Sequence, residues 1–488
     1  MLLEIRNLQV QYENRSKPAV ADLSLTVGSD EFVLVAGDSA SGKSTAMQAV
    51  CGFIPSIIPA KMSGDVRFDG RSYEDPTQIA KIACMVQQDP ESQFCTETVE
   101  DEVAFGPENF RYPPGRIRES IDRSLRGVGA SHLIDRRLST LSGGEKQKVA
   151  IASMLAIDPQ ILILDEPTSS LDPRSVRDVV SAIDILRKDR DITTIVIEHR
   201  LGSFLHRAER IVLLEKGRLL TDCRRGNDVF ESLAASAMSP PEPRSSVTSQ
   251  NPVLRVRDLS YAVDGNSILS HVDLDVNEGA ILGLMGENGS GKTTLLRHLT
   301  GLIDVQKGEI SILKHRLNCS IRGEPWILGK EIGLVFQNPN HQIFENTVRD
   351  EILFASLNFG KSVETATAAI AEFERSEDVN RSVHPHCLSF GQKRRVNIKS
   401  ASSHGPRILL MDEPFAGQDP SNSAAIADLV AGLQRSGKTI ILVTHDPVFA
   451  RHFCTDIAVM SEGRVCISDR TPNISEESWE ALGEGRLP

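Results

Sequence analysis

Residues 37–45 read GDSASGKST, and nearly the same pattern returns at residues 286–294 as GENGSGKTT. Both match G-x-x-x-x-G-K-[ST], in which glycines let the backbone curl so that several N–H groups face the phosphates of a nucleotide. Lys43 and Lys292 supply the charge that meets the β and γ phosphates, while Ser44 and Thr293 offer a hydroxyl to magnesium. The predicted nucleotide contacts are Gly37, Ser39, Ala40, Ser41, Gly42, Lys43, Ser44, Thr45, Gly286, Asn288, Gly289, Ser290, Gly291, Lys292, Thr293 and Thr294.

The surrounding motifs also occur twice, in the same order. QDPESQF from Gln88 returns as QNPNHQIF from Gln337, and TVEDEVAF, LSGGEKQ and ILILDEPTSSLDP return as TVRDEILF, LSFGQKR and ILLMDEPFAGQDP. The spacing is nearly constant, with 249 residues between Lys43 and Lys292, so this is a tandem duplication of one domain rather than a short-period repeat. We expect a first domain at 1–235, a proline- and serine-rich linker at 236–252, a second domain at 253–472 and a tail at 473–488.

Composition excludes several classes of protein. Of the 488 residues 40% are hydrophobic and 25% are charged, as is usual for globular chains. The net charge of −12 argues against a general nucleic-acid binder, which usually presents a basic face. The eight cysteines form no CxxC pair, so neither a zinc site nor a disulfide framework is indicated. No apolar run approaches the ~18 residues of a membrane span, so a membrane role would have to come through a partner.

Short apolar runs bounded by turns predict buried parallel strands and therefore an α/β core. FVLVAG and AILGLMG precede the glycine-rich loops, and ILILDEP, TTIVIEH and TIILVTH end in polar residues. Asp165 and Asp412 stand where they can hold magnesium, and the adjacent Glu166 and Glu413 can polarise an attacking water. A solvated acidic strand end is the alternative, which the upstream phosphate loops make the weaker interpretation.

Two further pairs of residues follow apolar strands at matching positions. His199 and His445 could touch a γ-phosphate, although a capped loop histidine would look the same in sequence. Tyr12 and Tyr261 could stack on an adenine ring, with an ordinary strand tyrosine as the alternative.

Together these motifs resemble the ATP-binding-cassette (ABC) ATPase family over nearly the whole chain, twice. LSGGEKQ and LSFGQKR are similar to its signature motif. The resemblance implies two tandem P-loop NTPase domains, each with a parallel-sheet core, a helical subdomain and an antiparallel β part. It also implies ATP and Mg²⁺ as cofactors, with Gln88 and Gln337 among the metal ligands. The cassettes would pair head to tail, so that Ser142 and Gly144, or Ser389 and Gly391, close on the nucleotide of the other cassette.

Three positions depart from the family pattern. Phe390 replaces the first signature glycine, Gln418 stands where the first copy has Leu171, and Glu198 precedes His199 where Thr444 precedes His445. None of them removes a predicted phosphate ligand, but the two sites could differ in rate.

The pattern Q-[ND]-P, then Q-[FI], then V-x-D-E resembles the CbiO-like ATPases of energy-coupling factor importers. This implies a transmembrane coupling protein and a membrane substrate-binding protein as partners, and a peripheral location on the cytoplasmic face of the membrane. A vitamin or a transition-metal ion would be imported. The acidic segments Glu100–Glu102 and Asp350–Glu351 would then dock a basic helix, with a solvated helix face as the alternative.

Other kinds of cassette protein share parts of this pattern. Fused sugar-importer ATPases usually lack catalytic groups in the second site, and fused peptide-importer ATPases lack the Q-[ND]-P stretch. Soluble tandem cassettes usually carry a long charged helical linker, unlike SPPEPRSS.

Overall fold

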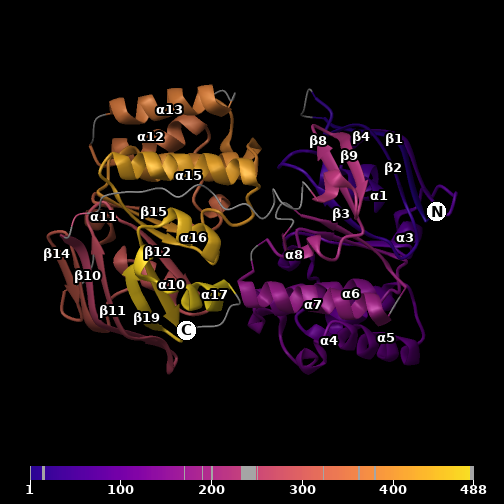
Figure 1. Ribbon diagram of the computed structural model, residues 1–488, viewed down its shortest axis with the longest axis horizontal. Coiled ribbons are helices and arrows are strands. Elements are labelled where there is room, and N and C mark those ends of the chain that lie inside the picture. Colours follow the sequence, from indigo (N-terminus) through magenta and orange to yellow (C-terminus); the bar gives the residue numbers. More distant parts are fainter. Residues whose placement is uncertain are drawn as a thin grey trace. The chain divides into compact units, whose positions relative to one another are not determined.

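The apolar runs that flank the glycine-rich loops form the strands of two similar sheets in the computed structural model (Figure 1). The structure describes residues 2–13, 17–169, 171–189, 191–198, 202–231, 249, 251–321, 324–360, 363–377 and 381–483. By their internal contacts the residues divide into two units, residues 1–239 with 417–421 and residues 240–416 with 422–488. Of the predicted linker 236–252, only 249, 251 and 252 are among the described residues.

The first unit is built on a sheet whose described strands have the order β5-β6-β7-β3-β8-β9. Their bounds are β3 Phe32–Ala36, β5 Ala83–Val86, β6 Ile161–Asp165, β7 Thr193–Ile197, β8 Arg210–Glu215 and β9 Arg218–Arg224. All run parallel except β9, which pairs antiparallel with β8. Strands β3, β5, β6 and β7 are buried along their whole length, as expected for parallel strands covered on both faces.

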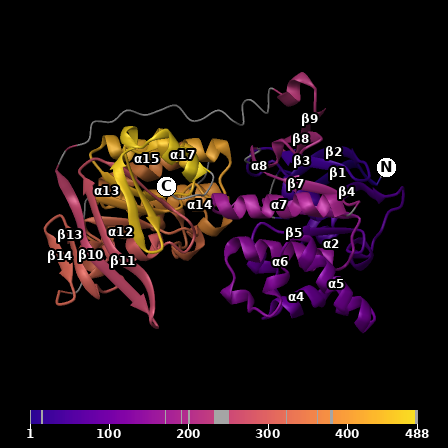
Figure 2. The ribbon, with the colours of Figure 1, turned by 60° about the horizontal axis from the view of Figure 1, so that its bottom comes forward.

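The remaining elements of the first unit are an antiparallel sheet and a set of helices. The sheet has the order β2-β1-β4, with β1 Leu3–Tyr12, β2 Val20–Val27 and β4 Ala60–Phe68. The helices are α1 Lys43–Val50, α2 Phe53–Ser56, α3 Pro76–Ile79, α4 Val99–Asn109, α5 Pro114–Gly127, α6 Gly143–Leu155, α7 Pro173–Asp189 and α8 Gly202–Leu205. Helices α4, α5 and α6 pack against one another as a helical part (Figure 2).

The second unit repeats this plan. Its main sheet has the order β15-β16-β17-β12-β18-β19, with β12 Ile281–Gly286, β15 Ile332–Val335, β16 Ile408–Asp412, β17 Thr439–Val443, β18 Asp456–Ser461 and β19 Arg464–Arg470. The antiparallel sheet β11-β10-β13-β14 comprises β10 Pro252–Val263, β11 Asn266–Asn277, β13 Lys307–Ile312 and β14 His315–Asn318. The helices are α10 Lys292–Leu299, α11 Pro325–Leu328, α12 Val348–Asn358, α13 Val363–Glu377, α14 Phe390–Ser403, α15 Pro420–Arg435, α16 Pro447–Phe453 and α17 Glu476–Gly483.

Helix α17 lies in the segment predicted as a tail, and it packs on the core of the second unit. Trp479 and Leu482 are buried in the same apolar cluster as Phe453, and Arg451 pairs with Glu476. Residues 484–488 are outside the described part of the chain.

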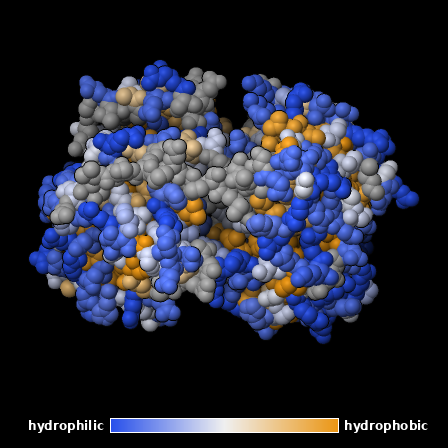
Figure 3. All heavy atoms as spheres, in the orientation of Figure 1, coloured by the Kyte–Doolittle hydropathy of each residue, from blue (hydrophilic) through white to orange (hydrophobic). Residues whose placement is uncertain are grey.

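The predicted fold class is confirmed: each unit has a parallel-sheet core, a helical part and an antiparallel sheet. Among the residues coloured in Figure 3, hydrophilic side chains cover more of the visible surface than hydrophobic ones. Among the residues that the structure describes, no helix combines the length and the apolarity that a membrane span requires. Because β3, β6 and β7 are parallel, as are β12, β16 and β17, their carboxyl ends meet at one edge of each sheet, where α/β folds usually bind ligands.

Candidate functional site

Two glycines in each phosphate loop adopt backbone conformations that other residues rarely take. The φ angles of Gly37 and Gly286 are 143° and 142°, and those of Gly42 and Gly291 are 98° and 99°. A Cβ on Gly37 would stand 2.2 Å from the carbonyl oxygen of Leu214. Since no side chain fits there, the backbone at both ends of each loop stays bare, as close approach of a phosphate requires.

The lysine of each loop begins the following helix and is buried. Nζ of Lys43 donates to the carbonyl oxygens of Gly37 at 2.7 Å and Asp38 at 2.9 Å. Nζ of Lys292 makes the same two contacts in the second unit, to Gly286 at 2.8 Å and Glu287 at 2.7 Å. The ammonium group thus lies within the curl of its own loop, where the β and γ phosphates are expected.

Burial and charge act in opposite directions on the first of these lysines. Burial lowers the pKa of Lys43, and the carboxylates of Glu166 and Asp165 act against it. The carboxyl ends of β3 and β6 therefore bring the phosphate loop and the acidic pair within electrostatic range of each other.

The hydroxyl after each lysine bonds to the aspartate that ends a core strand. Oγ of Ser44 donates to Oδ1 of Asp165 at 3.0 Å, and Oγ1 of Thr293 donates to Oδ2 of Asp412 at 2.8 Å. Burial raises the pKa of Asp412, while the hydrogen bond from Thr293 lowers it. Hydroxyl and carboxylate oxygens are the hard ligands that Mg²⁺ prefers, so each unit brings two predicted magnesium ligands together.

The glutamate after each aspartate is held in a left-handed backbone conformation. Glu166 has a φ of 47° and Glu413 a φ of 49°. The amide of Glu166 donates to the carbonyl of Ile197 at 2.9 Å, and that of Glu413 to Val443 at 3.2 Å, which fixes both residues to the neighbouring strand. Such a conformation is uncommon for a residue with a side chain and recurs at functional sites.

Polar side chains from other segments reach these glutamates. Nε2 of Gln88 donates to Oε2 of Glu166 at 2.6 Å, and Nδ1 of His445 lies 2.9 Å from Oε2 of Glu413. The structure therefore brings Gln88 and His445 to the predicted bases. Gln337 occupies the position of Gln88 in the second unit, and its carbonyl oxygen accepts from Arg394. His199 lies outside the described residues.

The two tyrosines are half-buried and contact the helix that follows each phosphate loop. The hydroxyl of Tyr12 lies 3.1 Å from Oγ1 of Thr45. The ring of Tyr261 meets that of His298 edge-on, with 4.7 Å between ring centroids. Stacking of either ring on adenine stays a prediction.

The signature motifs form the starts of α6 and α14. Ser142 forms a capping box with Glu145, and Ser389 forms one with Gln392. A Cβ on Gly144 would meet Cβ of Ser175 at 2.9 Å, so the second signature glycine is required by the packing of α7. In the second unit a Cβ on Gly391 would come even closer, 2.5 Å from the side chain of Asn422 on α15.

The first signature position differs between the units. A Cβ on Gly143 would lie 3.2 Å from Cδ2 of Leu171, which leaves little room for a larger residue. The second unit has Phe390 there, 41% exposed, and Gln418 where the first has Leu171, so both positions change together.

Two of the acidic residues predicted to face a membrane partner point inward instead, so this part of the prediction is wrong. Glu102 and Glu351 are buried. Oε2 of Glu102 accepts from the amides of Cys95 and Thr96, and Oε2 of Glu351 accepts from those of Phe344 and Glu345. The helical stripe explains this, because Glu102 follows Val99 by three residues and precedes Val103 by one. Glu100, Asp101 and Asp350 are exposed.

The second glutamine of the Q-[ND]-P stretch has a role that the sequence analysis did not assign. The amide of Gln87 donates to Gln93 Oε1 at 2.8 Å, and that of Phe336 donates to Gln342 Oε1 at 3.0 Å. Gln93 and Gln342 therefore hold the loop that carries Gln88 or Gln337. Their recurrence in QDPESQ and QNPNHQ was the available signal.

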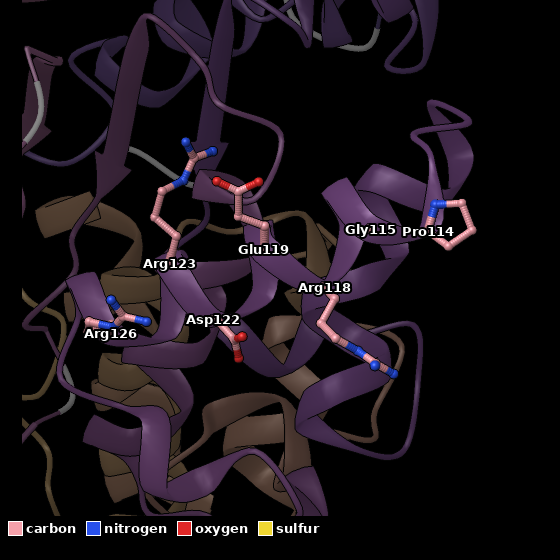
Figure 4. A pocket seen from close by; sticks show the side chains of 7 residues that line it. All are labelled: Pro114, Gly115, Arg118, Glu119, Asp122, Arg123 and Arg126. Atoms are coloured by element: carbon pink, nitrogen blue, oxygen red, sulfur yellow. The ribbon is translucent and has the colours of Figure 1, made fainter.

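A shallow hollow on the surface of the first unit contains none of the motif residues described above. It is lined by Pro114, Gly115, Arg118, Glu119, Asp122, Arg123 and Arg126, all from α5, whose side chains Figure 4 shows. Mixed charges on one exposed helix are typical of a solvated face.

Comparison with known proteins places the chain in a family. The model of the ABC transporter family matches residues 20–169 and 269–416. A Methanosarcina mazei protein named "Putative ABC transporter ATP-binding protein" is 33% identical over 474 residues, covering 95% of this chain and 94% of its own. The Bacillus subtilis "Putative HMP/thiamine import ATP-binding protein YkoD" is 33% identical over 500 residues, covering 94% and 90%.

A solved structure, CbiO1 of Clostridium perfringens, described as part of the ABC transporter complex CbiONQ, is 27% identical. It covers 48% of this chain and 90% of its own, with a TM-score of 0.43. The chain belongs to the ABC transporter family: it is an ATP-binding protein with two cassettes, and an ATPase.

Proposed function

We propose that the chain is the ATPase subunit of an energy-coupling factor importer and powers uptake of a vitamin or a transition-metal ion through a transmembrane partner. The observation that carries this is the Q-[ND]-P…Q-[FI]…V-x-D-E segment in both cassettes, whose second glutamine and buried glutamate together fix the loop. A relative that matches 94% of the chain bears the name of a thiamine import ATP-binding protein, which supports the same class.

Hydrolysis would depend on Mg²⁺, and the residues at both sites fit that ion. Two pairs of residues supply oxygen ligands at hydrogen-bond distance from each other: Ser44 with Asp165, and Thr293 with Asp412. The side chain of Gln88 bonds Glu166, the residue that follows Asp165. The ion would neutralise charge that develops on the transferred phosphoryl group.

The chain's own residues would bind the nucleotide and activate water. Lys43 and Lys292 direct an ammonium group at the phosphates from inside their loops. Glu166 and Glu413, fixed by their amides to the neighbouring strand, would orient the attacking water and accept its proton. His445, at 2.9 Å from Glu413, would hold that carboxylate in place.

We further propose that the two cassettes pair head to tail when ATP binds. The starts of α6 and α14 carry the signature glycines, and helix N-termini attract phosphate through free amides and the helix dipole. Each cassette then has two elements that bind phosphate: the phosphate loop for its own nucleotide, and the start of the signature helix for the nucleotide held by the other cassette.

The loop that carries Gln88 or Gln337, here called the glutamine loop, is followed by α4 or α12. The exposed start of each of these helices would dock a helix of the membrane protein. Glu100, Asp101 and Asp350 offer negative charge, and the rings of Phe105 and Phe354 are partly exposed at corresponding positions of α4 and α12. A basic helix with an apolar side suits such a surface, because charge pairs that lose water on docking give specificity.

The test is a charge reversal of this surface, Asp101→Lys with Asp350→Lys. The variant should be lost from membranes that contain the coupling protein, with ATP hydrolysis by the purified chain changed little. Glu119→Lys with Glu364→Lys, exposed acids on α5 and α13, is the matched control and should stay bound. Normal co-purification of the first variant with the membrane protein would reject the docking role.

A further inference from the structure

Arg394, on the signature helix α14, is fully buried in the second cassette. Its Nη1 donates to the carbonyl oxygen of Phe336 at 2.6 Å, and its Nη2 donates to that of Gln337. A buried guanidinium is costly unless its donors are matched, and carbonyl oxygens at short range match two of them. Arg394 therefore joins α14 to the loop that carries Gln337.

The same guanidinium also contacts the signature motif. It lies over the ring of Phe390, with 5.5 Å from the guanidinium carbon to the ring centroid, one helical turn earlier on α14. Burial lowers the pKa of Arg394 to about 10, and the carboxylates of Asp412 and Glu413 oppose that shift. One side chain thus links the unusual signature residue to the loop that carries Gln337.

The first cassette is built differently at this position. Gln147 stands where the second cassette has Arg394, and it is also buried. Its Nε2 has no hydrogen-bond partner within the part of the chain that the structure describes. In both cassettes the second glutamine, Gln93 or Gln342, bonds the loop. In the second cassette Arg394 bonds it as well, and these hydrogen bonds to Phe336 and Gln337 are called the clamp.

We propose that Arg394 is a positioning residue that makes the glutamine loop and the signature helix of the second cassette move as one piece. This rests on the role proposed for Gln337 as a magnesium ligand. When Gln337 moves toward a bound nucleotide, Arg394 would carry α14 and Phe390 with it. In the first cassette α6 meets this loop through the partly exposed ion pair of Lys146 with Glu91, at 2.5 Å. Because an exposed ion pair contributes little, the loop of Gln88 would move more independently of α6. The clamp makes the cassettes mechanically unequal even though both retain a phosphate loop, an aspartate and a glutamate.

The test replaces the clamp with the residue that the first cassette uses, Arg394→Gln. In the Glu166→Gln background, where turnover reports the second site, we expect the Mg²⁺ concentration for half-maximal hydrolysis to rise by about tenfold, the size of one lost charge-assisted hydrogen bond. The maximal rate should change much less. Arg394→Lys, which keeps the charge and can still donate to carbonyls, should restore most of the Mg²⁺ response. Arg395→Gln, the adjacent residue that bonds Asn422, is the matched control.

A second measurement does not depend on hydrolysis. Hydrogen exchange at the amides of residues 336–338, in the chain without nucleotide, should speed up in Arg394→Gln and not in Arg395→Gln. If Arg394→Gln retained the wild-type exchange and the wild-type Mg²⁺ response, the clamp would be rejected while the ATPase and its importer role stood. If Arg394→Gln did not fold, Arg394→Lys would decide. Wild-type hydrogen exchange and a wild-type Mg²⁺ response in Arg394→Lys would support the clamp, whereas faster exchange and a weaker Mg²⁺ response would favour a purely structural arginine. Absence of hydrolysis in every variant would instead count against the proposed function.

Discussion

The two cassettes share their phosphate loops and acidic strand ends but differ in the parts that connect those elements. In the first cassette Gln88 bonds Glu166, the predicted base, and Gly143 occupies the first glycine position of the signature. In the second, His445 reaches the glutamate, Phe390 occupies the first signature position, and Arg394 clamps the loop. The contrast teaches that the two cassettes share the groups expected to meet nucleotide and differ in the side chains that connect those groups.

The largest effect should come from replacing both predicted bases, and it tests whether Glu166 and Glu413, which the two cassettes share, are catalytic. Glu166→Gln with Glu413→Gln should lower the rate of ATP hydrolysis by about 10²–10⁴-fold, the usual contribution of a general base. Nucleotide binding should persist, because the phosphate loops are untouched. Steady-state hydrolysis and nucleotide-binding assays measure the two. Hydrolysis at the wild-type rate would reject both glutamates as bases.

Replacing the buried glutamates that hold the glutamine loops should have an effect of intermediate size. Glu102→Ala and Glu351→Ala each leave two backbone amides without their acceptor, which should lower the free energy of unfolding by about 1–3 kcal/mol. Glu100→Ala, on the exposed face of α4, is the control and should stay within about 0.5 kcal/mol of the wild type. Denaturant unfolding provides the values. Equal, negligible losses in all three variants would mean that these carboxylates do not hold the loops.

The smallest predicted effect concerns the inequality itself. We expect the site formed by Lys43 and Ser389 to be slower by severalfold, because the ring of Phe390 crowds the approach that Gly143 leaves open. Comparing the hydrolysis rates of Glu166→Gln and Glu413→Gln measures the two sites separately. Phe390→Gly should bring the two rates closer together. Equal rates in the single variants would remove the case for a slower site.

The local motifs were sufficient to predict the parts of the fold and site that depend on neighbouring residues in sequence. The phosphate loops need glycine at fixed positions, and buried parallel strands leave a continuous apolar signature, so the strand ends that carry Asp165 and Asp412 could be located. The pairing of Ser44 with Asp165 follows from parallel strands ending at one edge. These are short-range consequences of backbone geometry.

Contacts between distant segments could not be predicted in the same way. Nothing in LSFGQKRR indicates that Arg394 reaches the carbonyls of Phe336 and Gln337, since that contact depends on how α14 packs against the loop. Likewise, Glu198 bonds Thr168 at 2.5 Å, although the sequence shows only a departure from threonine. The inward direction of Glu102 could have been foreseen from its place in the apolar stripe of α4.

The central claim, that each cassette holds a nucleotide in its own phosphate loop, is tested most directly by counting nucleotides. The Glu166→Gln, Glu413→Gln chain is expected to bind ATP without consuming it, so equilibrium dialysis with Mg²⁺ and radiolabelled ATP gives the number bound per chain. The account predicts two, falling to one when Lys292→Ala is added, because that ammonium group lies inside the second loop. One ATP per chain before Lys292 is changed would contradict it.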